Sequence, residues 1–235
     1  MDKQFNKLNN PNLFIEYLNN NLDTQLNDFL SNLKLIAEVY IFSGVIRNFI
    51  LNFRKIRDLD LVISCDKVVF EIFIEKYKYR KNSFGGYKIL FENKSIDLWY
   101  LEDTWAIKNN LIYPKLFLNE SLPETSFFNF SAVIFDVKSK EFIYNNKFRD
   151  FIQSKNLDIV LENNPLPQLC IVNIIYYKRN YLLDLSENTM KYYLKYFNDF
   201  DEEQYNLIQL KHFSEVIYEY GLLKTYYRIF IEEVY

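Results

Sequence analysis

Cysteine and histidine are scarce in this chain, and their scarcity excludes several kinds of chemistry. The 235 residues include two cysteines, Cys65 and Cys170, and one histidine, His212. Two thiols are too few for a disulfide framework and are typical of a reducing compartment. A zinc site or a Ser-His-Asp triad would have to use His212, and no partner motif surrounds that residue. We therefore expect a cytoplasmic protein without thiol, zinc or serine-hydrolase chemistry.

Long apolar runs and an excess of positive charge are also missing. No stretch approaches the roughly 20 apolar residues that a membrane-spanning helix needs, and the polar N-terminal residues are not typical of a signal peptide. The net charge of −3 argues against a protein that coats nucleic acid generally. We expect no membrane partner, and RNA binding would need a local basic patch. Two patches are candidates: Arg47, Arg54, Lys55 and Arg57, and Lys76, Lys78, Arg80 and Lys81.

Apolar residues are abundant, at 49% of the chain with 19% aromatic, so a substantial core can form. Periodicity predicts strands near residues 38–42, 59–63, 87–91 and 95–101, a second hairpin over 131–144 that turns at 138–140, and mainly helices after about 148. Asp23 and Asp66 are expected helix N-caps. The expected organisation is an N-terminal helical extension (1–22), a central α+β domain (23–147) and a helical C-terminal domain (148–235).

The most informative segment is SGVIRN at residues 43–48, which follows the expected strand at 38–42. Ser43 and Gly44 allow a tight turn and a close approach of the backbone to a phosphate. A helix that begins in this segment would direct free backbone N–H groups at that phosphate. Arg47 would add a charge-assisted hydrogen bond. The segment therefore predicts a phosphate-binding turn.

A pair of aspartates, Asp58 and Asp60, follows on the next expected strand. Side chains alternate along a strand, so the two carboxylates point to the same side and repel each other unless a cation lies between them. Mg²⁺ prefers such hard oxygen ligands, and Mn²⁺ is the alternative ion. Asp97, on the expected strand at 95–101, would complete a two-metal site. One ion would then activate an attacking hydroxyl and the other would stabilise the leaving pyrophosphate.

Residues 39–63 resemble the head domain of the tRNA nucleotidyltransferase and poly(A) polymerase family. That family has a strand, Gly-Gly-x-x-Arg-Asp, a short apolar helix, and Asp-x-Asp on the next strand. Four residues match this pattern: Gly44, Arg47, Asp58 and Asp60. Ser43 replaces the first glycine, Asn48 replaces the aspartate, and Asp97 lies where many members of the wider superfamily carry a third carboxylate. The resemblance implies a mixed β-sheet flanked by helices that binds a nucleoside triphosphate with Mg²⁺, with Ser43 and Asn48 among the nucleotide-binding positions.

Two later segments match the family more weakly. Residues 127–133 lie where CCA-adding relatives have Arg-Arg-Asp-Phe-Thr-Ile-Asn-Ala, and residues 163–167 lie where they have Glu-Asp-Pro-Leu-Arg. Phe127, Phe128 and Pro167 occupy the arginine positions. The polar residues that read the incoming base in those relatives are therefore missing. The match supports common ancestry and argues against CCA addition.

Two functions stay open at this point. The first is a Mg²⁺-dependent nucleotidyltransferase that moves a nucleotide from a triphosphate to a hydroxyl of an RNA 3′ end such as that of tRNA, a small molecule or a protein. The second is a catalytically inactive descendant that binds a nucleotide or a protein partner. The changes at Ser43 and Asn48 keep the second function open, and the three aspartates favour the first. The sequence does not name the acceptor or the preferred base.

Overall fold

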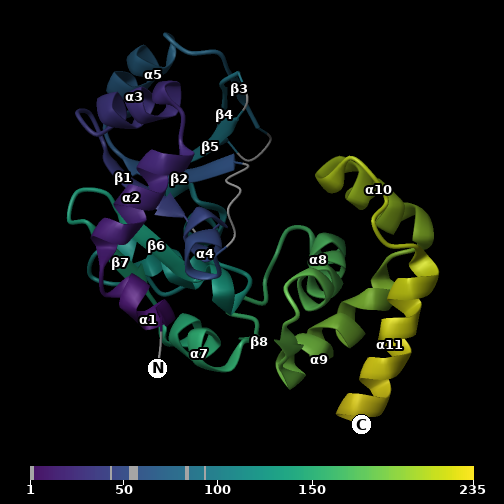
Figure 1. Ribbon diagram of the computed structural model, residues 1–235. Helices are drawn as coiled ribbons and strands as arrows, with labels where there is room; N and C mark the ends of the chain where they lie inside the picture. Colours follow the sequence, from purple (N-terminus) through teal and green to yellow (C-terminus); the bar gives the residue numbers. More distant parts are fainter. Residues whose placement is uncertain (1–2, 43, 53–57, 83–84, 93) are drawn as a thin grey trace. The chain divides into compact units, whose positions relative to one another are not determined.

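The computed structural model describes the chain apart from residues 1–2, 43, 53–57, 83–84 and 93 (Figure 1). Contacts between residues divide the chain into two compact units. The first unit contains Met1–Ser126 and Phe130–Ile152, and the second contains Phe127–Asn129 and Gln153–Tyr235. Whether the segments 1–22, 23–147 and 148–235 are separate domains stays a prediction.

The first unit is built on a mixed sheet, which has seven strands in the described part of the chain, in the order β3-β4-β5-β2-β1-β6-β7. The strands are β1 (Glu38–Phe42), β2 (Asp58–Ser64), β3 (Tyr79–Lys81), β4 (Tyr87–Leu90), β5 (Ser95–Tyr100), β6 (Val133–Asp136) and β7 (Glu141–Tyr144). Strand β2 runs parallel to β5, and the other neighbouring pairs are antiparallel. The sequence predicts every strand except β3, whose three residues are all exposed and give no alternating pattern.

The helices of the first unit begin where the sequence supplies suitable residues. They are α1 (Lys3–Leu8), α2 (Pro11–Asn21), α3 (Thr24–Leu33), α4 (Gly44–Ile50), α5 (Lys67–Ile74), α6 (Trp105–Lys108) and most of α7 (Asn146–Ser154), with 3₁₀ turns η1 (Leu101–Asp103), η2 (Leu118–Thr125) and most of η3 (Asn129–Ser131). Asp23 Oδ1 accepts the Leu26 N–H at 2.9 Å, and Asp66 Oδ1 accepts the Val68 N–H at 2.8 Å. Both aspartates are the N-caps that their positions predict.

Helices cover one face of this sheet. The Phe14 ring of α2 lies 4.9 Å from the Phe135 ring of β6, and the Phe70 ring of α5 lies 5.2 Å from the Tyr87 ring of β4. The strand register places Phe135 and Tyr87 on the same face, because side chains alternate along each strand. This face therefore forms the larger part of the core.

The opposite face has an apolar half and a polar half. A buried apolar cluster on this face comprises Tyr40, Val62, Leu101, Leu122 and Ile134. Asp58 and Asp60 lie on β2 in phase with Val62, so their side chains leave the sheet on this same face. The polar half thus begins where the apolar cluster ends, at the first residues of β2.

The second unit is mainly helical. It contains α8 (Pro167–Asn180), α9 (Glu187–Tyr196), η4 (Phe197–Asp199), α10 (Glu202–Phe213), α11 (Tyr220–Val234) and the short parallel pair β8 (Asn156–Leu157) and β9 (Asp184–Leu185). A buried side chain, Gln209, joins α10 to the segment before α11. Its Nε2 donates to the Tyr218 carbonyl at 3.0 Å, and its Oε1 accepts the Tyr218 N–H at 2.9 Å. These two bonds fix the α10–α11 connection.

These observations confirm the predicted fold class, an α+β arrangement with a mixed sheet flanked by helices and followed by a helical C-terminal region. Within the described ranges, no helix has the length and apolar character that crossing a membrane requires.

Candidate active site

The pairing of β2 with β5 places Asp60 beside Asp97. Asp58 lies opposite Ser95 and Asp60 lies opposite Asp97 in this parallel pair. Strand β4 continues the row, because Lys88 lies opposite Asp97 in the antiparallel pair β4–β5. Equivalent register positions on neighbouring strands put their side chains on one face, so Lys88, Asp97 and Asp60 form a row across three strands. Asp97 therefore lies on the strand next to Asp60 and on the same face of the sheet.

Two of the three carboxylates have polar partners in the sheet. Ser95 Oγ donates to Asp58 Oδ1 at 2.9 Å. Lys88 Nζ donates to Asp97 Oδ2 at 3.0 Å, and the Lys88 and Asp97 side chains are only 26% and 20% exposed. Because both are partly shielded from water, this ion pair is stronger than a fully exposed one.

The ionised carboxylate of Asp60 is destabilised by its surroundings. Burial raises the pKa of its carboxyl to about 6, and the negative charges of Asp97 and Asp58 act in the same direction. The positive charges of Arg47 and Lys88 oppose this rise of the Asp60 pKa. A carboxylate that burial and like charges destabilise is one that an added cation would stabilise.

Helix α4 places Gly44 and Arg47 near Asp60. It begins at Gly44, where an added Cβ would lie 3.4 Å from Asp60 Oδ2, so the backbone here lies close to the carboxylate. The Arg47 guanidinium lies over the Phe130 ring at 4.9 Å from the ring centre. Arg47 and Asn48 are half-buried on the same helix. Ser43, the remaining predicted nucleotide-binding residue, lies outside the described residues.

The oxygen ligands that the site offers suit a divalent cation. Asp58 and Asp60 offer hard oxygen ligands from one side of β2, and burial and neighbouring carboxylates destabilise the Asp60 charge, so these two residues fit Mg²⁺. Among the residues that the structure describes, no three Asp, Glu, His or Cys side chains are grouped closely enough to hold a metal ion. The pairing of Asp97 with Lys88 is the contact that competes with such a group. The convergence of all three aspartates on metal stays a prediction.

Sequence reasoning missed Lys88 and Ser95. Both lie on strands that the sequence predicts, and alternation against the buried Tyr87 and Ile89 places Lys88 on the other face of β4. What the sequence does not supply is the hairpin register. That register decides that Lys88, and not a neighbouring residue, lies opposite Asp97.

The structure describes one of the two predicted basic patches and leaves most of the other outside the described residues. Arg54, Lys55 and Arg57 lie outside the described residues. In the other patch, Arg80 is exposed on β3, and Lys81 pairs with Glu71 at 3.1 Å. Strand β3 is the edge strand next to β4, so Arg80 extends the row of Lys88, Asp97 and Asp60 by one strand.

The positions of the lost arginines are filled by packing side chains within the second unit. The Phe127 ring lies 5.0 Å from the Tyr192 ring, and the Phe128 ring lies 5.4 Å from the Tyr177 ring. Pro167 is the first residue of α8, a position that proline favours. These three residues therefore support the helical unit and offer no side-chain hydrogen bond to a base.

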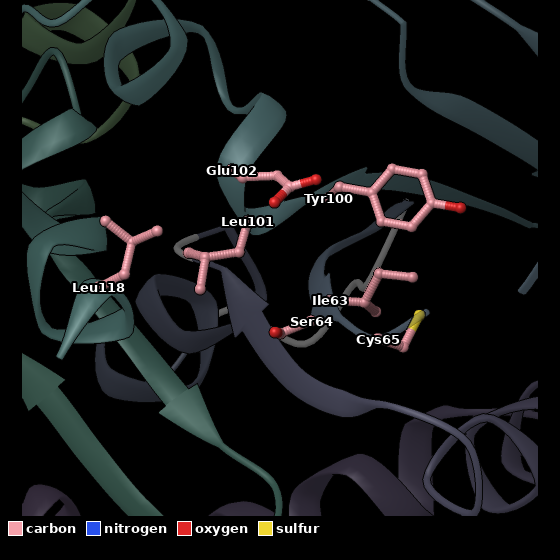
Figure 2. A pocket seen from close by; sticks show the side chains of 7 residues that line it. All are labelled: Ile63, Ser64, Cys65, Tyr100, Leu101, Glu102 and Leu118. Atoms are coloured by element: carbon pink, nitrogen blue, oxygen red, sulfur yellow. The ribbon is translucent and has the colours of Figure 1, made fainter. Parts of the chain in front are cut away.

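A small cavity lies at the other end of β2 and β5, beside Ser64 and Tyr100 (Figure 2). Its volume of about 70 Å³ is far below the roughly 300 Å³ at which ligand pockets begin. Cys65 also lines it, and burial, followed by the charge of Asp66, raises the pKa of its thiol to about 11. A thiol of this kind stays protonated and unreactive near neutral pH.

Solved structures of CCA-adding enzymes share the fold of this chain. A CCA-adding enzyme in complex with CTP aligns with a TM-score of 0.65 and 14% identity, over 94% of this chain and 54% of that one. The Thermotoga maritima CCA-adding enzyme complexed with tRNA gives 0.59 and 13%, over 93% and 53%. A tRNA nucleotidyltransferase complexed with a primer tRNA and an incoming ATP analogue gives 0.58 and 16%, over 84% and 59%. The chain thus spans a little over half the length of these proteins.

No protein-family model matches the chain, and no curated protein is significantly similar to it in sequence. At identities of 13–16% the structural likeness establishes a fold and not an activity. The chain has the nucleotidyltransferase fold. The resemblance of residues 39–63 to the head domain of the tRNA nucleotidyltransferase and poly(A) polymerase family is confirmed at the level of that fold.

Proposed function

We propose that this protein is a Mg²⁺-dependent nucleotidyltransferase that moves a nucleotide from a nucleoside triphosphate to a hydroxyl acceptor. The observation that carries the proposal is the position of Asp58 and Asp60 on β2, beside Asp97 on β5 and against Gly44 at the start of α4. Asp97 and Asp58 raise the pKa of Asp60, so these neighbouring carboxylates oppose folding unless a cation offsets their charge.

Each residue has a proposed role. Asp58 and Asp60 hold the divalent cation, and Asp97 is the third carboxylate of the site. Bound Mg²⁺, or Mn²⁺ in its place, supplies Lewis-acid stabilisation of the charge on the phosphates. Ser43 and Gly44 let the triphosphate approach the backbone, and Arg47 contributes a charge-assisted contact to it. Asn48 is a further nucleotide-binding position.

The acceptor is proposed to be a hydroxyl other than that of a tRNA undergoing full CCA addition. The compared structures contain CTP, an ATP analogue or tRNA. In this chain Phe127 and Phe128 pack against tyrosines, so these positions offer no polar group to read a base. A different RNA 3′ end, a small molecule or a protein side chain fits this site better. The reducing environment that the two free cysteines favour agrees with a cytoplasmic enzyme.

A second candidate function is a catalytically inactive descendant that binds a nucleotide or a protein partner. The pairing of Asp97 with Lys88 favours it, because that carboxylate is already neutralised by a residue of the chain. The two functions differ in whether covalent transfer occurs. The enzyme requires that a nucleotide binds near Gly44 and Asp60, whereas the inactive descendant binds either a nucleotide or a protein partner.

One experiment separates them. The protein is incubated with each α-labelled triphosphate in turn, with Mg²⁺ and total RNA, and separately with total protein, and products are read on gels. Transfer that Asp60→Asn abolishes and Asp28→Asn preserves supports the enzyme; Asp28 is an exposed residue of α3 and serves as the matched control. Nucleotide binding without transfer to any acceptor would favour the inactive descendant.

A further inference from the structure

We propose that Lys88 holds Asp97 away from the metal, so that the site takes a single divalent cation at Asp58 and Asp60 and Lys88 itself supplies a second positive charge. This inference rests on the proposed function and refines it. It assigns a role to a residue, Lys88, for which the expected three-carboxylate arrangement has no place.

Strand register places Lys88 and Asp97 directly opposite each other in the sheet. Lys88 is the register partner of Asp97 across β4–β5, and Asp97 is the register partner of Asp60 across β2–β5. Long side chains on an exposed surface choose among several partners. Here the ladder hydrogen bonds of two strand pairs set the positions of all three residues. That register brings the two side chains within reach of each other, and Lys88 Nζ lies 3.0 Å from Asp97 Oδ2.

Partial burial strengthens the electrostatic attraction between Lys88 and Asp97. The Lys88 and Asp97 side chains are only 26% and 20% exposed, so water screens their attraction less than it screens a surface pair. Removing one partner of such a pair leaves the other as an uncompensated charge. A metal ion that recruited Asp97 would first have to displace Lys88 or be placed beside its ammonium group.

Among the described residues, the charges around Asp60 fit one divalent ion better than two. Asp97, Asp58, Arg47 and Lys88 are charged residues of this described set that act on Asp60. The three carboxylates and two basic side chains of this set sum to one net negative charge, which one divalent cation already exceeds. A second such ion beside Lys88 would have to overcome strong repulsion by like charge.

Lysine is well suited to this place. Its ammonium group is a compact charge on a flexible stem and can contact a phosphate while remaining close to a carboxylate. Arg80, opposite Lys88 on β3, continues the positive side of the row toward the edge of the sheet. The side chains of the row are therefore negative at Asp60 and Asp97 and positive at Lys88 and Arg80. A triphosphate bound over Asp60 that extends toward β4 would lie near these positive charges.

The test is a Mn²⁺ titration of the full chain without nucleotide, in which electron paramagnetic resonance counts the bound ions. The expected stoichiometry is one ion for wild type, for Lys88→Arg and for Lys81→Met. Lys81 is the matched control because it lies on neighbouring β3 with its side chain on the opposite face, where it pairs with Glu71. Lys88→Met is expected to bind a second ion, because the variant frees Asp97. Circular dichroism confirms folding of each variant.

The double variant Lys88→Met with Asp97→Asn removes the pair as a neutral unit, so it keeps the test decisive if Lys88→Met does not fold. We expect it to bind one Mn²⁺ with nearly wild-type affinity. A fall of about tenfold or more in Mn²⁺ affinity would overturn the proposal, because Asp97 would then ligate the metal. Two ions in wild type, or one in Lys88→Met, would also overturn it while leaving the proposed function in place. No ion in wild type would overturn both.

Discussion

Asp60 and Asp97 are register partners in the parallel pair of β2 and β5, and each bears on the charge of the other. The negative charge of Asp97 destabilises the ionised form of Asp60. Burial is the largest cause of its raised pKa, and Asp97 is the second. The strain has consequences for stability as well as for metal binding.

Replacing Asp60 with Asn should stabilise the metal-free protein in a pH-dependent manner. The folded-state pKa of about 6 lies above the ordinary value of 3.8, so ionisation of Asp60 opposes folding once the pH exceeds the ordinary value, and this opposition is complete above the folded pKa. The free energy of unfolding of Asp60→Asn should exceed that of wild type by up to about 3 kcal/mol at pH 8 and converge with it near pH 4.

Urea unfolding with a chelator present, repeated across this pH range, measures the difference. Asp28→Asn, on the exposed surface of α3, is the control and should show no such trend. A variant less stable than wild type at pH 8 would mean that Asp60 is a structural residue and not a strained one.

Arg47→Ala should weaken nucleotide binding while the fold is preserved. The guanidinium lies over Phe130 and its positive charge acts on Asp60, so it is close to where the triphosphate is proposed to bind. One charge-assisted contact is worth about 1.5–3 kcal/mol, which is about ten- to a hundredfold in affinity. Calorimetric titration with ATP and Mg²⁺ measures this change.

Arg149→Ala is the comparison for that titration, because Arg149 is an exposed arginine of α7 in the same unit. Equal ATP affinities of Arg47→Ala and Arg149→Ala would place the nucleotide away from α4.

Substitutions at Gly44 should separate folding from binding. An added Cβ would lie 3.4 Å from Asp60 Oδ2, which is an ordinary contact, so Gly44→Ala should fold with unchanged or slightly raised stability. The larger side chain of Gly44→Leu should obstruct the approach of phosphate to the backbone and abolish ATP binding. Thermal unfolding and ATP titration of the two variants are the measurements. Full ATP affinity in a folded Gly44→Leu protein would contradict the proposed phosphate-binding turn.

Gln209→Leu should destabilise the second unit. The buried Gln209 side chain satisfies both the N–H and the carbonyl of Tyr218, and leucine would leave both groups without those bonds. Each buried unsatisfied group costs about 1–3 kcal/mol, so the loss should be about 2–6 kcal/mol in the free energy of unfolding. Lys211→Leu, at an exposed position of the same helix, should change it little. A loss no larger than that of the control would show that water replaces the two bonds.

The sequence alone determines the local features of the site. The two-residue spacing of Asp58 and Asp60 fixes their shared side on any strand, because strand side chains alternate. Asp23 and Asp66 mark helix starts because a short carboxylate side chain can accept the free backbone N–H groups there. Gly44 and Arg47 are identified by the pattern that they share with a known family. Each of these inferences depends only on neighbours in the chain.

Tertiary structure decides which distant residues meet. The parallel pairing of β2 with β5 places Asp97 beside Asp60, and the register of β4 on β5 places Lys88 on Asp97. A shift of the β4–β5 pairing by one residue would put Lys88 opposite a residue on the other face of β5, and the ion pair would be lost. Strand β3 likewise forms only because β4 offers it an edge, since its own residues carry no alternation. The sequence therefore determines the donors of the site, whereas sheet register determines which charges balance them.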